Sequence, residues 1–231
     1  MEQKTNSETK PGKTAIVAGA GGLTGSFLLE GLSKDPYFEK IIVLSRKPGQ
    51  SVLPKVLEIG VDFDKLESYS FWSDADVLFC CIGNTISKAK SRENFRKVDY
   101  EIPVKLATLC ELHHIAFHLI SSLGANAESP NFYLKTKGQT EEALKAIGLP
   151  GLFIYRPSML FGPRKETRIG ESMGKAIMWL THPLLQGLLK KYRGIHVKTV
   201  ASAMIKNAKD GKTGTYIFES EELKEIAKNS R

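Results

Sequence analysis

Tyr133 and Lys137 are the pair whose types and spacing point most directly to chemistry. They stand four residues apart in a segment with helical periodicity, so both side chains project from one face of a helix. A neighbouring ammonium lowers the pKa of a phenol, and a tyrosine tuned in this way can exchange a proton with a carbonyl or an alcohol. Ser121 and Ser122 follow the preceding apolar run and offer a hydroxyl to the substrate oxygen. Because neighbours on an extended strand point in opposite directions, the spacing leaves open which serine does so, and we favour Ser122.

A glycine-rich loop near the start of the chain is suited to binding a pyrophosphate. Gly19, Gly22 and Gly25 form a GxxGxxG pattern between an apolar run and a helical pattern. Glycines there permit a tight turn and close approach of the backbone, and free N–H groups at the helix N-terminus stabilise the charge. A glycine triplet alone also occurs in flexible turns, but this strand-and-helix setting is the one that a dinucleotide site requires. Leu23 and Thr24, in the first helical turn, are also expected to contact the cofactor.

Arg46 and Lys47 follow the second apolar run, where an NAD site typically has an acidic residue for the ribose hydroxyls. The arginine fork can grip a 2′-phosphate instead, and the lysine adds charge. We therefore predict NADP(H) as the cofactor, the alternative being that both residues are solvated loop charges. For Asp62, which lies near the end of the third apolar run, a simple role in a turn explains the residue nearly as well as a cofactor contact does. Because ligands lie at the carboxyl ends of parallel strands, further cofactor contacts are predicted at Asp62, Phe63, Ile82, Gly83 and Thr85, and Ser121 is counted with them.

Short apolar runs alternate with helical patterns along the chain, which indicates βαβ units. Right-handed crossovers then give a parallel sheet with helices on both faces, so the predicted fold is α/β, a Rossmann-type doubly wound parallel sheet. Strands are expected at 14–18, 41–44, 60–63, 76–82, 115–120 and 151–155, with 215–218 as a further candidate. Helices are expected at 23–32, 95–112, 132–147, 171–181 and 200–208 and at the charged C-terminus. We expect a disordered leader over 1–12 and a single domain over 13–231, in which 157–231 forms a small C-terminal substrate-side lobe.

Taken together, these motifs resemble those of the short-chain dehydrogenase/reductase superfamily, with Ser122, Tyr133 and Lys137 at its catalytic positions. The chain is most similar to the atypical HIV Tat-interacting oxidoreductase-like family. That resemblance implies NADP(H), a small C-terminal lobe, and backbone contacts to the nicotinamide side from Arg156 and Pro157. The superfamily's usual asparagine in the fourth helix is replaced near Val98-Asp99, which puts its proton relay in doubt. The matching segments are 19–25, 61–63, 80–83, 121–125, 133–138 and 155–160.

The leading functional hypothesis is hydride transfer between NADP(H) and a small-molecule carbonyl or alcohol substrate. In it Tyr133 is the acid/base, Lys137 holds the nicotinamide ribose and tunes Tyr133, and Ser122 orients the substrate. One alternative is a regulatory or redox-sensing module whose C-terminal lobe responds to NADP(H) and docks a protein partner. Another is sugar-nucleotide epimerase chemistry, suggested by the segment 156–163. Arg164 and Arg168 either bind an anionic substrate or form a solvated basic loop.

Composition and charge exclude several other classes of protein. The net charge of +8 is spread along the chain without a zinc-finger or RNP pattern, so no nucleic-acid binding is expected. The apolar stretch 173–189 is interrupted by polar residues and is too short for a membrane span. Three cysteines do not make a disulfide framework, and with no export signal they predict a reducing, cytoplasmic location. The histidines lack partners at ligand spacing, so no metal is predicted.

Overall fold

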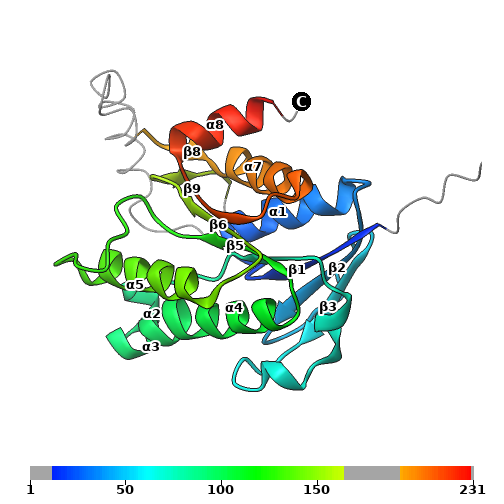
Figure 1. Cartoon of the computed structure of the whole chain (residues 1–231), viewed down its shortest axis with the longest axis horizontal. Helices are drawn as coiled ribbons and strands as arrows, with labels where there is room; N and C mark the ends of the chain where they lie inside the picture. Colours follow the sequence, from blue (N-terminus) through cyan, green and yellow to red (C-terminus); the bar gives the residue numbers. More distant parts are fainter. Residues whose placement is uncertain (1–11, 164–192, 230–231) are drawn as a thin grey trace, which may run out of the picture.

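A computed structural model describes residues 12–163 and 193–229. Its centre is a sheet of seven parallel strands in the order β3-β2-β1-β4-β5-β6-β9, the doubly wound order of a Rossmann domain (Figure 1). This arrangement confirms the predicted fold class. The strands are β1 (Lys13–Ala18), β2 (Phe38–Ser45), β3 (Val56–Gly60), β4 (Val77–Cys80), β5 (Ala116–Ile120), β6 (Gly151–Arg156) and β9 (Gly214–Glu219).

Helices cover both faces of the sheet and separate its core into two layers (Figure 1). On one face α4 (Ile102–Leu112) and α5 (Phe132–Ile147) pack through residues such as Leu106 and Leu144. On the other face lie α1 (Leu23–Lys34), α7 (Val197–Asp210) and α8 (Ser220–Lys228). Short elements complete the described chain: α2 (Ile86–Ala89), α3 (Arg92–Arg96), two 3₁₀ turns (Leu66–Ser68 and Ser70–Asp74), and the two-stranded sheet of β7 (Leu160–Phe161) and β8 (Ile195–His196).

Two predicted elements differ from the structure. The third strand was expected at 60–63 but spans Val56–Gly60, because this edge strand is only partly buried and lacks a continuous apolar run. The long helix expected over 95–112 is divided by the π-helical turn η3 (Lys97–Glu101) between α3 and α4. A π turn inserts an extra residue and rotates the following side chains, which helical periodicity alone does not reveal.

The C-terminal part of the chain is not set apart from the sheet along its described length. β9 pairs with β6 as the last strand of the central sheet, and α7 packs against α1. The predicted helix at 171–181, the apolar stretch 173–189, Arg164, Arg168 and nearly all of the predicted leader lie outside the described residues. Within 12–163 and 193–229, no helix has both the length and the apolar character needed to cross a bilayer.

Candidate functional site

The glycine loop between β1 and α1 has the geometry of a phosphate cradle. Gly19 has a φ of +90°, and a Cβ there would lie 2.6 Å from the Cys81 carbonyl carbon. A Cβ on Gly25 would lie 2.2 Å from the Gly19 oxygen. Both positions therefore exclude a side chain. Gly22 caps α1 without a side-chain hydrogen bond, and the first turn contains no acidic residue, so the helix N-terminus suits an anion.

The predicted adenosine-side residues are spread over neighbouring strand ends. Arg46 and Lys47 follow β2 and are exposed, and within the described part of the chain neither forms an ion pair. Asp62 is exposed and its carboxylate accepts a hydrogen bond from the Asp64 N–H at 2.9 Å, so it acts as a turn residue. Phe63 packs against the α4/α5-side core. The side chains of Arg46 and Lys47 are thus accessible to a ligand. The Asp62 carboxylate instead stabilises the turn that follows β3.

The carboxyl end of β4 leads into a loop that lies beside Lys137. A Cβ on Gly83 would lie 3.7 Å from the Lys137 Nζ. Thr85 caps α2 by accepting a hydrogen bond from the Lys88 N–H at 3.3 Å. Ile82 is half-buried between the glycine loop and this turn. The predicted contacts from Ile82 to Thr85 therefore belong to the same edge of the sheet as Lys137.

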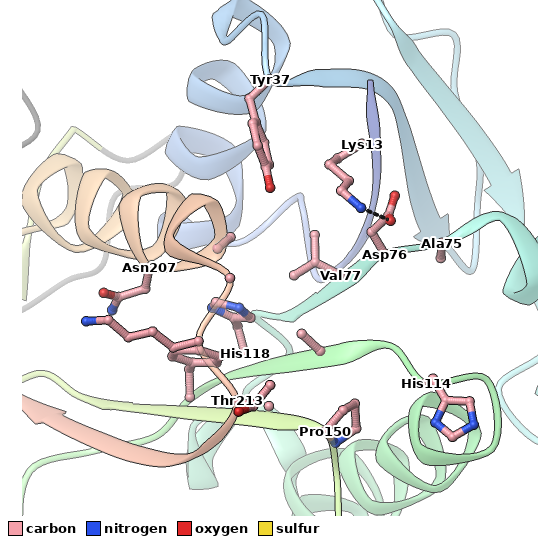
Figure 2. Close-up of a pocket in the computed structure, with 16 residues that line it drawn as sticks. Lys13, Tyr37, Ala75, Asp76, Val77, His114, His118, Pro150, Asn207 and Thr213 are labelled. Atoms are coloured by element: carbon pink, nitrogen blue, oxygen red, sulfur yellow. Dashed lines mark hydrogen bonds and ion pairs between the residues drawn. The ribbon is translucent and has the colours of Figure 1, made fainter. Parts of the chain in front are cut away.

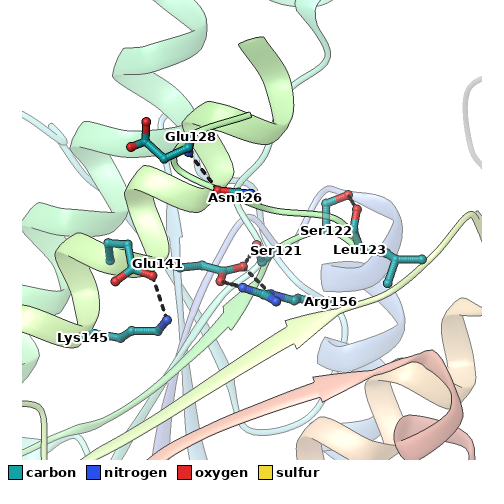
Figure 3. A network of polar contacts seen from close by, with 9 residues as sticks. Ser121, Ser122, Leu123, Asn126, Glu128, Glu141, Lys145 and Arg156 are labelled. Atoms are coloured by element: carbon teal, nitrogen blue, oxygen red, sulfur yellow. Dashed lines mark hydrogen bonds and ion pairs between the residues drawn. The ribbon is translucent and has the colours of Figure 1, made fainter. Parts of the chain in front are cut away.

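The two serines after β5 have different surroundings. The Ser121 hydroxyl is buried and donates a hydrogen bond to the Glu141 carboxylate (Figure 3). Ser122 is half-buried, and its hydroxyl has only a 3.4 Å contact with the Leu123 carbonyl oxygen. Of the two hydroxyls, that of Ser122 therefore has the longer and weaker hydrogen bond.

Tyr133 and Lys137 lie on α5, which Gly138 brings close to the loop after β5. A Cβ on Gly138 would lie 2.2 Å from the Ala127 nitrogen, so only glycine allows this approach. Tyr133 is half-buried with its ring 5.7 Å from that of Phe95, whereas Lys137 is buried. Its Nζ lies 2.8 Å from the Asp99 Oδ1. Burial alone lowers the pKa of Lys137, but the charges of Asp99 and Tyr133 raise it above the ordinary value.

Glu141, one turn beyond Lys137, joins β5, β6 and α5. Its carboxylate accepts hydrogen bonds from Arg156 Nε at 3.0 and 3.1 Å and from Arg156 Nη2, as well as from Ser121 (Figure 3). The backbone of Pro157, the residue after Arg156, also has a partner within the protein, because its carbonyl oxygen accepts a hydrogen bond from the Leu123 N–H at 3.0 Å. The Arg156 side chain therefore serves the protein's own packing.

Comparisons with known proteins place the chain in a family. Residues 13–101 match the family model described as semialdehyde dehydrogenase, NAD-binding domain. The chain is 34% identical over 201 residues to FMP52 of Candida albicans, covering 81% of this chain and 86% of that protein. It is 30% identical over 227 residues to HTATIP2 of Rattus norvegicus, covering 94% and 90%. The chain belongs to the HTATIP2-like family of atypical short-chain dehydrogenases/reductases.

Solved structures of low identity share the fold of this family member. A UDP-N-acetylglucosamine 4-epimerase from Methanobrevibacter ruminantium has a TM-score of 0.66 at 18% identity, over 90% of this chain and 76% of that one. A UDP-glucuronic acid 4-epimerase from Bacillus cereus, in complex with NAD, has a TM-score of 0.64 at 14% identity, over 89% and 77%. These likenesses show the Rossmann fold and leave the substrate undefined.

The sequence predicted a cytoplasmic location, and this prediction is wrong, because relatives of the chain are named mitochondrial. The FMP52 proteins of Candida albicans, Scheffersomyces stipitis and Debaryomyces hansenii are all named mitochondrial. The expectation failed because few cysteines and a polar start indicate only a reducing environment, which does not single out the cytoplasm.

Sequence reasoning missed Glu141 and Asn84 and noted Asp99 only as a departure from the superfamily pattern. Glu141 was detectable, because Tyr133, Lys137 and Glu141 share one helix face at four-residue intervals. The partners of Asp99 depend on the π turn and on long-range packing, so no local pattern reveals them. Burial raises the pKa of Cys80 to about 12 and also raises that of Cys81, so both thiols resist deprotonation. The described residues contain no cluster of three or more metal-ligating side chains.

A cavity of about 270 Å³ lies at the opposite, amino-terminal edge of the sheet (Figure 2). Lys13 and Asp76 form an ion pair of 2.7 Å at this cavity, and His118 also lines it. The His118 Nε2 has no hydrogen-bond partner among the described residues, but it is also closed off from solvent. This edge therefore presents an ion pair and a closed-off histidine, whereas the glycine cradle lies at the carboxyl edge.

Proposed function

We propose that the chain is an NADP(H)-dependent oxidoreductase that transfers a hydride to or from a small carbonyl or alcohol substrate. The observation that carries the proposal is the charged Lys137, buried against Asp99 and acting on Tyr133, at the carboxyl edge of the sheet. This edge also holds the glycine cradle, so proton-exchange chemistry and a dinucleotide site lie together.

The residues present fit NADP(H). Gly19 and Gly25 admit no side chain, which leaves room for a pyrophosphate at the uncapped start of α1. Arg46 and Lys47 offer exposed cations to a 2′-phosphate. When bound, NADP(H) supplies the hydride donor or acceptor. The edge from Ile82 to Thr85 and the backbone at Arg156 and Pro157 are the proposed neighbours of the nicotinamide half.

Each catalytic role follows from the surroundings of the side chain. Tyr133 Oη exchanges the proton with the substrate oxygen, because its phenol stands one helical turn before the buried Lys137 on α5. Ser122 holds the same substrate oxygen through its hydroxyl, whose bond to the Leu123 carbonyl oxygen is long at 3.4 Å. Lys137 binds the ribose hydroxyls and keeps a positive charge beside Tyr133. Ser121, already bonded to Glu141, is proposed to shape the floor of the site.

The proposal is tested by following NADPH absorbance with a panel of aldehydes, ketones and quinones. Turnover of at least one carbonyl class that depends on the enzyme concentration would support it. Tight NADPH binding without turnover of any compound would favour the regulatory hypothesis instead. Bound cofactor that copurifies and cycles without net redox change would favour epimerase chemistry.

The cofactor preference is tested with Arg46→Ala. Losing the guanidinium should weaken NADP⁺ binding about tenfold while changing NAD⁺ affinity less than about twofold, since one charge-assisted phosphate contact is worth about 1.5 kcal/mol or more. Titration of both cofactors by intrinsic fluorescence measures the two affinities. Lys40→Ala, which removes a charge from the other end of β2, is the matched control and should change neither. Equal affinity of the unmodified protein for NADP⁺ and NAD⁺ would contradict the assignment.

A further inference from the structure

Asp99 divides its carboxylate between two segments that flank the proposed nicotinamide site. It is fully buried in the π-helical turn η3. Its Oδ1 contacts the Lys137 Nζ at 2.8 Å, and its Oδ2 accepts a hydrogen bond from the Asn84 N–H at 2.9 Å. Its backbone oxygen accepts a further bond from Thr140 Oγ1 at 2.8 Å. One residue thus connects η3, the loop after β4 and the helix that carries Tyr133.

Lys137 depends on this carboxylate for its charge. Burial is the largest influence on the Lys137 pKa and lowers it, because an ammonium in a dry environment loses its hydration. The groups that oppose burial are Asp99 from η3, Tyr133 from α5 and Cys80 from β4, and Asp99 acts through the carboxylate oxygen that lies 2.8 Å from the Lys137 Nζ. Asp99 is the only carboxylic acid among these partners, since the other two are a phenol and a thiol.

Asp99 and Lys137 also lie close to Gly83, in the loop after β4, where the cofactor is proposed to bind. A Cβ on Gly83 would be 3.5 Å from the Asp99 Oδ1 and 3.7 Å from the Lys137 Nζ. An asparagine in place of Asp99 could accept a hydrogen bond from Lys137 but would supply no charge. The departure from the superfamily pattern at this position is thus a change in the electrostatics of the site.

We propose that Asp99 is the positioning residue that keeps Lys137 charged and fixed between Tyr133 and the loop after β4. This role rests on the proposed function, in which Lys137 serves Tyr133 and the cofactor ribose. At the position where the superfamily has the asparagine of its proton relay, this chain thus has Asp99, a buried counter-ion for Lys137. Without Asp99, the burial of Lys137 drives it toward the neutral amine, which no longer attracts the cofactor or places a positive charge beside Tyr133.

The first test reads the charge of Lys137 directly and needs neither substrate nor cofactor. In full-length protein labelled with ¹³C-lysine, the Cε resonance missing from Lys137→Met identifies Lys137. In the unmodified protein this resonance should show no titration below about pH 10, whereas in Asp99→Asn it should titrate at least two pH units lower, as buried lysines without a counter-ion do. Titration of Lys137 below pH 9 in the unmodified protein would overturn the proposal even if the variant does not fold. An unchanged titration in folded Asp99→Asn would overturn it as well.

The second test links that charge to the site. NADPH affinity of Asp99→Asn should be about threefold weaker at pH 6 and at least tenfold weaker at pH 9, because the loss grows as Lys137 gives up its proton. Asp64→Asn makes the same chemical change at an exposed ion pair with Lys97 and should match the unmodified protein at both pH values. In a Lys137→Arg background, Asp99→Asn should lose its pH dependence, because a guanidinium keeps its charge without a partner.

The outcomes separate the two proposals. A pH-independent loss in Asp99→Asn, or a loss no larger than that of Asp64→Asn, would overturn the role of Asp99. Failure of the unmodified protein to bind NADPH would instead overturn the proposed function, while the lysine titration would still decide whether Asp99 holds the charge.

Discussion

The two faces of the sheet bury their polar groups in different ways. On the α5 face the buried polar groups include two ion pairs, Lys137 with Asp99 and Glu141 with the partly buried Arg156. On the α7 face they form a neutral chain, in which Tyr155 Oη lies 2.8 Å from the His118 Nδ1 and accepts a hydrogen bond from the Asn207 amide at 3.2 Å. Burial keeps His118 neutral by lowering its pKa to about 3 and keeps Tyr155 a phenol by raising its pKa.

The difference follows from what each face has to do. Burying full charges is costly, and a hydrophobic substitute is often at least as stable, so ion pairs are poor devices for stability alone. The α5 face retains two of them beside the proposed site, where a fixed cation has chemical use. On the α7 face, where α1, α7 and α8 pack together, the chain of Tyr155, His118 and Asn207 is buried without charge.

The sharpest contrast between the faces should come from matched tyrosine variants. Tyr133→Phe should lower kcat by about 10²- to 10⁴-fold, because it removes the group that exchanges the proton. Tyr155→Phe should leave kcat within about twofold but lower the free energy of unfolding by about 1 to 2 kcal/mol, since His118 and Asn207 lose their shared partner. Steady-state kinetics and urea denaturation measure the two effects. A Tyr133→Phe enzyme with normal turnover would remove the catalytic role from the α5 face.

The neutral chain on the α7 face should make the protein sensitive to acid. The unfolded His118 takes up a proton near pH 6.5, but the folded one does so only near pH 3. Between these values the unfolded state binds more protons, so stability falls with falling pH, by about 3 kcal/mol between pH 7 and pH 4 for this one group.

Urea denaturation at pH 7, 5.5 and 4 of the unmodified protein and of His118→Phe isolates this contribution. The variant starts from lower stability, because Tyr155 loses a partner, but should lose less as the pH falls. Parallel losses in the two proteins would show that His118 is not the acid-sensitive group.

Glu141→Gln tests whether the second ion pair serves the fold more than the chemistry. It leaves Arg156 without its counter-ion and should lower the free energy of unfolding by about 2 kcal/mol, less than for a fully buried pair because the Arg156 side chain is 21% exposed. Glu142→Gln, the neighbouring residue in an exposed pair with Lys145, should cost less than about 0.5 kcal/mol. Thermal unfolding reports both, and kcat of Glu141→Gln should stay within about threefold at a temperature where it is folded.

The two serines offer the smallest and most local contrast. Ser122→Ala should lower kcat about tenfold or more by removing the hydroxyl that holds the substrate oxygen. Ser121→Ala should change kcat less than about twofold and cost about 1 kcal/mol of stability through its lost bond to Glu141. Kinetics on the same substrate distinguish the two, and the reverse ranking would place Ser121 in the site.

Much of this architecture follows from local sequence patterns. The glycines after the first strand, the buried strands and the spacing of Tyr133 and Lys137 are read from neighbouring residues, because backbone geometry and helical periodicity are short-range properties. These patterns sufficed for the fold and the family. They also indicated where the cofactor should bind, which stays a prediction for the individual residues.

Tertiary structure decided what long-range packing controls. The register of edge strand β3 depends on its pairing with β2, and the position of Asp99 depends on a π turn that helical periodicity cannot show. The difference between Ser121 and Ser122 arises because Glu141, twenty residues beyond Ser121, folds back against the end of β5. The sequence by itself therefore determined which chemical groups this protein has near its site, while only the folded chain decided which are already engaged and which stay free, because burial and partners come from segments distant in sequence.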